Sequence, residues 1–410
     1  MNDAREVALA VIRRVFEQDA YADRALTSEV DRAGLDDRAR ALASHLALGT
    51  VQRRRTLDAA LEQLANRPVK RLERVLAHAL RLGAFQLLFA DGIPPHAAVS
   101  ETVELVRRRI GPRAVGIANA VLRRIAADGE AWLAALPEET AEQCAIRHSL
   151  PDWVTELWFD AYGGERAREL SRLANDPPPL AIRPNPLRAE AGAVEAALST
   201  ANVPFHLDAA TGSLVLGGPF DLMGSALYRD GLVFAQALPS AVAALRVGSE
   251  AGMRVLDLCA APGGKTAILA ASGAHVTAVE RHSGRAIALR RTLERLGAEV
   301  EVVNADGRGY RSELPFDRIL LDAPCTGLGV LAARADARWR RKLEDVAELS
   351  SLQSQLIAHA HTQLAPGGKL VYSVCTLTPP ENEGAVTAAG LAPLDEQRAE
   401  GFYTAEVVEG

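Results

Sequence analysis

The chain has few cysteines, and none of them stands in a metal-binding or disulfide pattern. Its 410 residues include four cysteines, with no Cys-x-x-Cys pair and no secretory signal ahead of them. The sequence therefore indicates neither a zinc site nor a disulfide framework, and we expect no bound metal and a reducing cytoplasm. The four are Cys144, Cys259, Cys325 and Cys375.

Long apolar runs are also missing. The longest candidate spans residues 76–89 and is interrupted by Arg81, so it is too short to cross a bilayer as a helix. We therefore expect a soluble protein without a membrane partner. Hydrophobic residues make up 48% of the chain, and a chain of this length with that content forms sizeable cores, in two or three domains.

No complete nucleotide-binding fingerprint occurs, although one glycine-rich turn stands out. Residues 253–258 form a short apolar run typical of a buried parallel strand, and residues 266–271 resume as a helix of small residues. Gly264-Lys265-Thr266 matches the end of a P-loop, but Cys259 occupies the place of its first glycine, and G-x-G-x-x-G is absent. Glycines allow close approach of backbone to a ligand, so we expect a cofactor cradle of another kind.

Four acidic residues lie at or just after the ends of successive apolar runs. The carboxyl ends of parallel strands meet at one edge of a sheet, where open α/β folds bind ligands. Glu280 lies 23 residues after Asp257 (280 − 257), about the distance at which a second-strand carboxylate reaches ribose hydroxyls. Each acid alone could instead cap a helix, but four in register favour one crevice. They are Asp257, Glu280, Asp306 and Asp322.

Two of the cysteines also follow apolar strands. Cys325 lies in the loop after residues 316–321, and Cys375 follows residues 370–374, so both are expected to open onto the same crevice. Cys144 has no functional context and Cys259 lies inside the turn. For these two, interpretation as small buried hydrophobic residues is favoured.

These segments resemble those of a known enzyme family. Residues 257–266 (DLCAAPGGKT), 322–325 (DAPC) and 372–376 (YSVCT), with Glu381-Asn382-Glu383, resemble the motifs of the Sun/Fmu family of S-adenosylmethionine-dependent RNA cytosine-5 methyltransferases. Near the amino terminus, IPPHAAV at 93–99 and ANAVLR at 118–123 resemble the NusB-like helical RNA-binding domain. The resemblance spans nearly the whole chain.

The resemblance implies three kinds of fold in series. We expect an all-α NusB-like domain at 1–130, a helical connector at 131–175, a small α+β RRM-like subdomain at 176–240 and an α/β Rossmann-like methyltransferase domain at 241–410. Apolar residues of helical period at 7–16 and 72–80 agree with a helical start. Pro94-Pro95 precedes a helix expected over 98–109, and Gly163-Gly164 ends another.

The resemblance also implies the cofactor contacts. Glu280 is expected at the ribose and Asp306 beside the adenine of S-adenosylmethionine, while Arg285 matches a further cofactor position. Asp322 is counted with both the cofactor and the catalytic residues. The loop expected around the methionine part of the cofactor comprises Cys259, Ala260, Ala261, Pro262, Gly263, Gly264 and Lys265.

Two cysteines and an acid suit methylation of a pyrimidine carbon. Carbon 5 of cytosine is a poor nucleophile until a thiolate adds at carbon 6, and a cysteine thiolate both attacks and leaves well. The resemblance makes Cys375 the nucleophile, Cys325 the group that assists product release and Asp322 the proton donor to ring nitrogen 3. DNA cytosine-5 methyltransferases use a Pro-Cys nucleophile, which would favour Cys325, and chemistry alone leaves both assignments open.

The implied substrate is a cytosine of 16S ribosomal RNA, conventionally position 967, in free RNA or an early small-subunit particle. A monomer is expected. Two other function classes remain. An RNA-binding scaffold with an inactive methyltransferase domain is disfavoured by the intact Asp322, Cys325 and Cys375. An ATP-dependent enzyme built on residues 264–266 is disfavoured by the missing first glycine.

Basic residues are concentrated toward the amino terminus. Residues 1–130 hold 21 Lys and Arg against 17 Asp and Glu, a net of +4, whereas the remainder holds 25 against 35, a net of −10. The clusters at 53–55 and 107–109 suit a phosphate backbone, although solvated helix faces have the same composition. A third basic stretch, at 334–342, is expected to grip phosphates near the pocket, with Trp339 packed inward.

The sequence departs from the family pattern in three places. Gln236-Ala237 replaces the usual Gln-Asp, the segment between Glu383 and the closing strand at residues 401–405 is short, and Val374 stands where Thr is common. None of these changes removes a catalytic group. The short segment leaves the end of the sheet in doubt.

Overall fold

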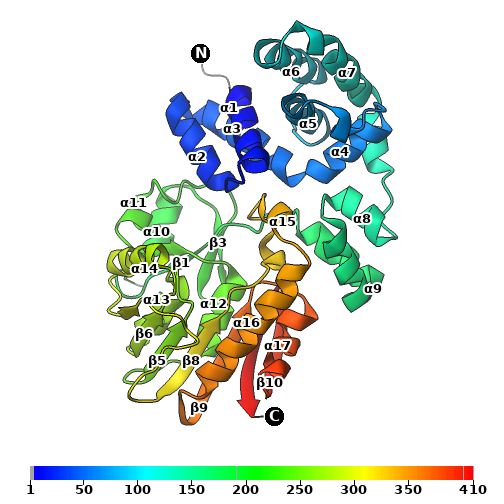
Figure 1. Ribbon diagram of the computed structural model, residues 1–410. Coiled ribbons are helices and arrows are strands. Elements are labelled where there is room, and N and C mark those ends of the chain that lie inside the picture. Colours follow the sequence, from blue (N-terminus) through cyan, green and yellow to red (C-terminus); the bar gives the residue numbers. More distant parts are fainter. Residues whose placement is uncertain (1–3, 191, 400, 410) are drawn as a thin grey trace. The chain divides into compact units, whose positions relative to one another are not determined.

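The structure, a computed structural model, describes residues 4–190, 192–399 and 401–409. It divides into two compact units (Figure 1). The helical unit comprises Met1–Asp176 and Leu331–Lys342, and the sheet unit comprises Pro177–Val330 and Leu343–Gly410. Within the described residues, no helix combines the length and apolar character that crossing a membrane requires.

The helical unit is built from amphipathic helices with identifiable ends. Asp36 caps one of them by accepting a hydrogen bond from the Ala39 N–H at 2.8 Å, and Thr140 forms a capping box with Gln143. The helices are α1 (Ala4–Glu17), α2 (Ala22–Ala33), α3 (Asp37–Gln52), α4 (Arg54–Gln63), α5 (Arg74–Leu88), α6 (Pro95–Arg109), α7 (Pro112–Ala134), α8 (Ala141–His148), α9 (Asp152–Leu173) and the short α15 (Ala337–Arg340).

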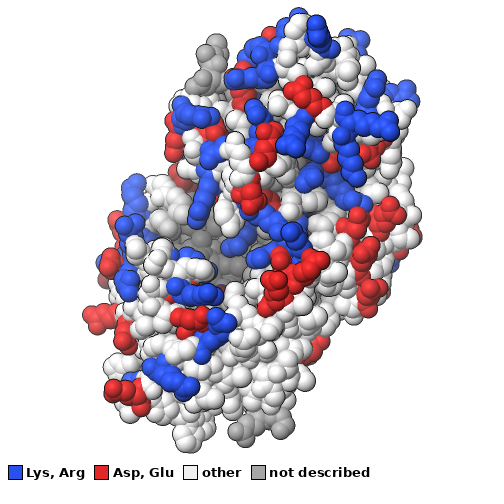
Figure 2. Space-filling view, viewed as in Figure 1, with Lys and Arg blue, Asp and Glu red and all other residues white. Residues whose placement is uncertain are grey.

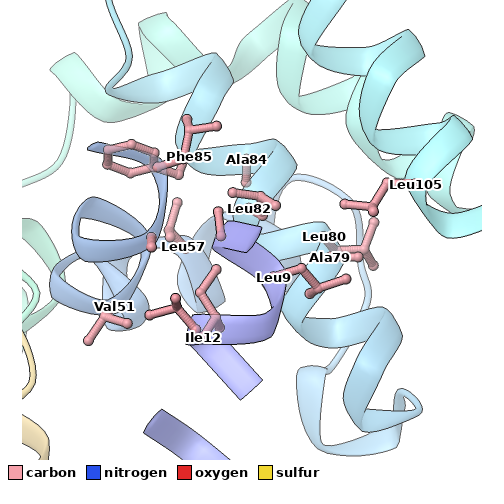
Figure 3. Packing of buried hydrophobic residues seen from close by; sticks show 14 of the residues in the cluster. Leu9, Ile12, Val51, Leu57, Ala79, Leu80, Leu82, Ala84, Phe85 and Leu105 are labelled. Carbon is pink, nitrogen blue, oxygen red and sulfur yellow. The ribbon is translucent and has the colours of Figure 1, made fainter. Parts of the chain in front are cut away.

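Helix α5 lies at the centre of this unit, and Figure 3 shows its buried side chains among those of neighbouring helices. Gly49 of α3 contacts it closely, because a Cβ there would lie 2.0 Å from the Phe85 ring. Arg81, which interrupts the apolar run, is buried and paired with Asp58 at 2.6 Å. The apolar run is therefore a core helix of a globular unit.

The helix boundaries lie close to those predicted from the sequence. Helix α6 starts at Pro95, three residues earlier than expected, because proline is accommodated in the first helical turn. The helix expected to end at Gly163-Gly164 is interrupted at Gly163, whose φ is 75°, but a second helical segment continues to Leu173. Helix α7 continues past residue 130, so it spans the first predicted domain boundary. The division into four segments stays a prediction.

The sheet unit begins with a small antiparallel sheet of strand order β2-β3-β1-β4. Ile182 and Leu214 pack with Val194 and Leu198 of a helix to form its core. Asn185 is buried and donates hydrogen bonds to the carbonyls of Gly231 and Leu296, both at 2.8 Å. The elements are β1 (Ala181–Pro184), α10 (Ala193–Thr200), β2 (Phe205–Asp208), β3 (Ser213–Leu216), α11 (Ala226–Arg229) and β4 (Val233–Ala235). This agrees with the expected small α+β subdomain.

The second sheet has the strand order β10-β11-β9-β8-β5-β6-β7. The strands from β9 to β7 are parallel, and β11 pairs antiparallel with β9. The β10–β11 hairpin completes the sheet despite the short carboxy-terminal segment. The strands are β5 (Arg254–Leu258), β6 (His275–Val279), β7 (Glu301–Val303), β8 (Phe316–Asp322), β9 (Leu364–Val374), β10 (Leu391–Ala399) and β11 (Phe402–Glu409).

Helices alternate with these strands, which gives the Rossmann-like arrangement predicted from the sequence. They are α12 (Leu238–Arg246), α13 (Gly264–Ala271), α14 (Ser283–Leu296), α16 (Glu344–His361) and α17 (Glu383–Ala388), with 3₁₀ turns η2 (Leu328–Val330) and η3 (Pro379–Glu381). All five parallel strands lie where apolar runs were found in the sequence. The fold class predicted from the sequence is confirmed.

Candidate active site

The parallel strands bring the predicted acids to one edge of the large sheet. Asp257 is the penultimate residue of β5, Glu280 directly follows β6, and Asp322 ends β8. Asp322 is in register with Ser373 near the end of β9. The carboxyl ends of four neighbouring strands therefore meet at this edge, as the spacing in the sequence predicts.

The turn after β5 is shaped by residues with positive φ. Cys259 has a φ of 63° and Gly263 a φ of 110°, and a Cβ at Gly263 would lie 2.8 Å from Leu289. Below the turn, the Thr266 hydroxyl donates to Asp257 Oδ2 at 2.7 Å. Burial raises the pKa of Asp257 to about 7, with the Asp322 charge adding to the rise and the Thr266 hydrogen bond opposing it.

A cavity of about 200 Å³ lies against this turn. Two buried acceptor atoms of its lining, Asp257 Oδ1 and Gln236 Oε1, have no hydrogen-bond partner among the described residues. Such atoms are costly unless a ligand satisfies them. The cavity is lined by Ala235, Gln236, Ala237, Ser240, Asp257, Cys259, Ala260, Ala261, Pro262, Gly263, Gly264, Lys265, Asp322 and Phe402.

Lys265 and Asp322 form an ion pair on one side of the cavity. Lys265 Nζ lies 2.7 Å from Asp322 Oδ2. Burial acts to lower the pKa of Lys265, but the charge and hydrogen bond of Asp322 outweigh it and raise that pKa above its ordinary value. The Lys265 ammonium is thus held charged beside the acid predicted to be catalytic.

The structure brings the two predicted reactive cysteines together. Cys325 Sγ and Cys375 Sγ lie 3.3 Å apart. The hydrogen bond with Cys375, together with burial and the nearby charges of Cys375, Glu381 and Asp322, raises the pKa of the Cys325 thiol. Cys325 is buried and Cys375 is half-buried. Cys375 is therefore the more accessible thiol of the pair.

The other two cysteines have different surroundings. Burial, followed by the charges of Glu280 and Asp322, raises the pKa of Cys259 to about 12. Cys144 is fully buried in the helical unit, and burial raises its pKa too. A thiol with a raised pKa is a poor nucleophile near neutral pH, which agrees with the structural role predicted for both.

The remaining predicted cofactor residues, Glu280, Arg285 and Asp306, do not line the cavity. Glu280 Oε1 accepts from the His282 N–H at 2.9 Å, and Arg285 bridges Glu280 Oε2 at 3.3 Å and the Ala261 carbonyl at 3.0 Å. The Arg308 side chain and backbone bond Asp306 and lower its pKa well below the usual range. Arg285 therefore supports the turn directly, and Asp306 is held ionised.

Comparisons with known proteins identify the family. The chain is 36% identical over 408 residues to Rv1407 of Mycobacterium tuberculosis, a protein named as a methyltransferase, and covers 87% of that protein with 95% of its own length. It is 34% identical over 363 residues to ribosomal RNA small subunit methyltransferase B of Sodalis glossinidius, with 87% of this chain and 82% of that protein covered. Residues 244–406 match the family described as 16S rRNA methyltransferase RsmB/F, and residues 2–127 match the NusB family.

The chain belongs to the RsmB/F family. The crystal structure of PH0851 is similar over 98% of both chains, with a TM-score of 0.77 at 22% identity, and this likeness concerns the fold. As a member of the RsmB/F family, the chain is an S-adenosylmethionine-dependent RNA methyltransferase. The cofactor and the enzyme class predicted from the motifs are confirmed.

The residues around the cavity fit S-adenosylmethionine chemically. This cofactor supplies an electrophilic methyl group on a sulfonium sulfur. It also carries hydrogen-bond donors in its ammonium group, ribose hydroxyls and adenine amine. The acceptors Asp257 Oδ1 and Gln236 Oε1, which line the cavity without a hydrogen-bond partner among the described residues, match such donors. The glycine turn allows backbone to approach the ligand.

The basic clusters of the helical unit are largely engaged with other side chains. Arg53 stacks on Phe89 at 4.8 Å, and Arg55 lies 2.5 Å from Asp152. In the cluster at 107–109, the arginines pair with the neighbouring acids Glu6 and Glu104. Figure 2 shows the same mixture on the face in view, where Lys and Arg alternate with Asp and Glu over the helical unit.

The basic stretch at residues 334–342 was expected to grip phosphates. One of its arginines, Arg338, is buried and is therefore not available to a phosphate. Leu331–Lys342 belongs to the helical unit, where Arg338 is fully buried and donates to the carbonyls of Ser149 and Ala174 at 2.9 and 2.7 Å. Burial lowers the pKa of Arg338 to about 9. Trp339 donates to the Val51 carbonyl at 2.6 Å, so its predicted inward packing is confirmed.

The structure also places residues at the site to which sequence reasoning assigned no site role. Five of them line the cavity, namely Ala235, Gln236, Ala237, Ser240 and Phe402, and Thr266 supports Asp257. The closing Gly-Phe strand was visible in the sequence, but nothing local indicated which face Phe402 would present. The signal for Thr266 was its place at the end of the turn motif.

Proposed function

We propose that this RNA methyltransferase modifies carbon 5 of a cytosine in 16S ribosomal RNA, conventionally position 967, through a covalent cysteine adduct. The observation that carries the proposal is the thiol pair, with Cys325 Sγ and Cys375 Sγ 3.3 Å apart at the ends of neighbouring strands. The name of the Sodalis glossinidius relative and the family description, both of which refer to small-subunit ribosomal RNA, support the substrate class.

In the first step, the Cys375 thiolate adds to carbon 6 of cytosine. The new S–C6 bond moves the electrons of the C5=C6 bond into the ring and makes carbon 5 nucleophilic toward the methyl group. Ring nitrogen 3 takes up a proton that the Lys265 ammonium passes through Asp322, whose Oδ2 lies 2.7 Å from Lys265 Nζ, and it returns this proton once carbon 5 has taken the methyl group. The greater exposure of Cys375 favours it over Cys325 as the attacking thiol.

In the second step, the product is released. A base removes the proton from carbon 5, the electrons of that C–H bond re-form C5=C6, and the C6–S bond breaks with its electrons returning to Cys375. Cys325 is the group placed to take this proton, since its sulfur lies beside Cys375. Because the pKa of Cys325 is raised, its thiolate, once formed, binds this proton strongly.

The cofactor roles extend the proposal. We assign the turn at 259–265 to the methionine part of S-adenosylmethionine, Glu280 to the ribose, Asp306 to the adenine and Arg285 to support of the turn. The NusB-like helices and the small sheet bind RNA in free form or in an early particle. The enzyme acts as a cytoplasmic monomer.

Bisulfite sequencing of 16S RNA tests this function. Deletion of the gene is expected to remove one 5-methylcytosine, and the wild-type gene, but not Cys375→Ala, is expected to restore it. Persistence of every 5-methylcytosine in the deletion strain would refute the assignment of substrate. A Cys375→Ala gene that restores the mark would refute the assignment of Cys375 as the attacking thiol.

A further inference from the structure

The threonine that follows each reactive cysteine joins the two cysteine loops. Thr326 and Thr376 are buried, and their hydroxyl oxygens lie 2.9 Å apart. One belongs to the loop after β8 and the other to the loop after β9. Adjacent to both lies Glu381 of η3, a fully buried residue from a motif to which sequence reasoning gave no role.

The Glu381 carboxylate accepts hydrogen bonds at both oxygens. Oε1 accepts from the Thr326 N–H at 2.8 Å and from Gln353 Nε2 at 3.1 Å. Oε2 accepts from the hydroxyls of Thr326 at 2.6 Å and Thr378 at 2.9 Å. All four donors are neutral groups. The carboxyl therefore acts as a hydrogen-bond acceptor at both oxygens, and four donors from three segments of the chain converge on it.

These bonds have a fixed direction. The single Thr326 hydroxyl proton is donated to Glu381, so at 2.9 Å the Thr326 oxygen accepts from the Thr376 hydroxyl. The relay therefore runs from the Cys375 loop through the Cys325 loop to the carboxylate. A backbone bond from the Gly329 N–H to the Cys375 carbonyl at 3.0 Å links the same two loops.

We propose that Glu381 is a positioning residue that holds the Cys325 and Cys375 thiols in register on the target base. The inference rests on the proposed function, because two thiols that act on adjacent ring carbons must be placed together. Misplacement of a reacting group by about 1 Å costs on the order of 100-fold in rate. The carboxylate charge also disfavours a thiolate at Cys325.

The test compares Glu381→Gln, Thr326→Val and Thr326→Ser with wild type. The amide of Glu381→Gln keeps the side-chain shape but places N–H donors where the hydroxyls now donate. We expect kcat for methyl transfer to unmodified 16S transcript to fall about 100-fold. The KM values for RNA and S-adenosylmethionine should stay within about twofold. Thr326→Val should resemble Glu381→Gln, and Thr326→Ser, which keeps the hydroxyl, should recover most of the rate.

A second measurement reports thiol placement without methyl transfer. Diamide, a diazene oxidant, takes up the two thiol hydrogens and leaves a Cys325–Cys375 disulfide, which is quantified by non-reducing peptide mass spectrometry with Cys325→Ala as the blank. Glu381→Gln should slow this cross-link about tenfold.

Each outcome decides a separate question. An unchanged kcat and cross-link rate in Glu381→Gln would overturn the inference. If that variant does not fold, equal rates for Thr326→Val and Thr326→Ser would overturn it instead. A wild type that makes no 5-methylcytosine would refute the proposed function, and the cross-link rates would still decide whether Glu381 holds the two thiols.

Discussion

Asp257 should make the stability of the sheet unit depend on pH. Its side chain is fully buried, Thr266 donates to one oxygen, and the other oxygen has no hydrogen-bond partner. Burial raises its pKa to about 7 from an ordinary value of 3.8. The folded protein thus binds this proton more tightly than the unfolded chain does.

The sign and size follow from the difference between the folded and unfolded pKa of Asp257. The free energy of unfolding that the Asp257 proton contributes is fully present below pH 3.8 and is lost as the pH rises through about 7. A tenfold difference in proton affinity corresponds to about 1.4 kcal/mol, so the total is about 4 kcal/mol as an upper value. Asp257→Asn, which has no charge to bury, should therefore gain stability relative to wild type by about 3 kcal/mol between pH 5 and pH 8.

The assay must report on the sheet unit alone. Tryptophan fluorescence does not report on the sheet unit, because all the tryptophans lie in the helical unit. They are Trp132, Trp153, Trp158 and Trp339. Hydrogen exchange of the β5 and β8 amides, corrected for intrinsic rates, gives the opening free energy of the sheet. Asp230→Asn, which removes an exposed charge in the same unit, is the matched control. A difference between Asp257→Asn and wild type that does not grow from pH 5 to pH 8 would refute the reasoning.

Three further predictions concern other parts of the chain. Cys325→Ala should accumulate a covalent RNA adduct on a denaturing gel while Cys375→Ala forms none, and the reverse pattern would exchange their roles. Ala237→Asp should stabilise α12 by about 1 kcal/mol, measured by hydrogen exchange, because Ala237 is an N-cap without a side-chain hydrogen bond. An unchanged exchange rate would show that no cap forms. Arg338→Met should destabilise the helical unit by about 3 to 5 kcal/mol in urea unfolding followed by tryptophan fluorescence, since it leaves buried carbonyls unpaired. A loss below about 1 kcal/mol would contradict this account of the buried guanidinium.

Much of the large sheet could be predicted from the sequence because its central parallel strands β5 and β6 and the carboxyl half of β9 are largely buried. Such strands read as short apolar runs, and each of β5 to β9 lies where a run was found. The positions of Asp322 and Cys325 followed directly, since a residue at the end of a parallel strand belongs to the ligand-binding edge.

Contacts between distant segments could not be predicted in the same way. Arg338 looked like a solvent-facing residue because its neighbours are charged, yet it is buried against residues 149 and 174 of the helical unit. Asn185 is buried by contacts with Gly231 and Leu296. Periodicity reports which face of an element is apolar, but it does not identify the partner.

The partners and protonation of the acids at the sheet edge could not be predicted from the sequence. The spacing placed Asp257, Glu280, Asp306 and Asp322 together, but their protonation depends on partners from elsewhere. Asp257 faces a threonine and has a raised pKa, whereas Asp306 faces Arg308 and has a lowered one. Asp322 pairs with Lys265. Four similar residues at one edge of the sheet therefore have different partners, and spacing in the sequence does not report those partners.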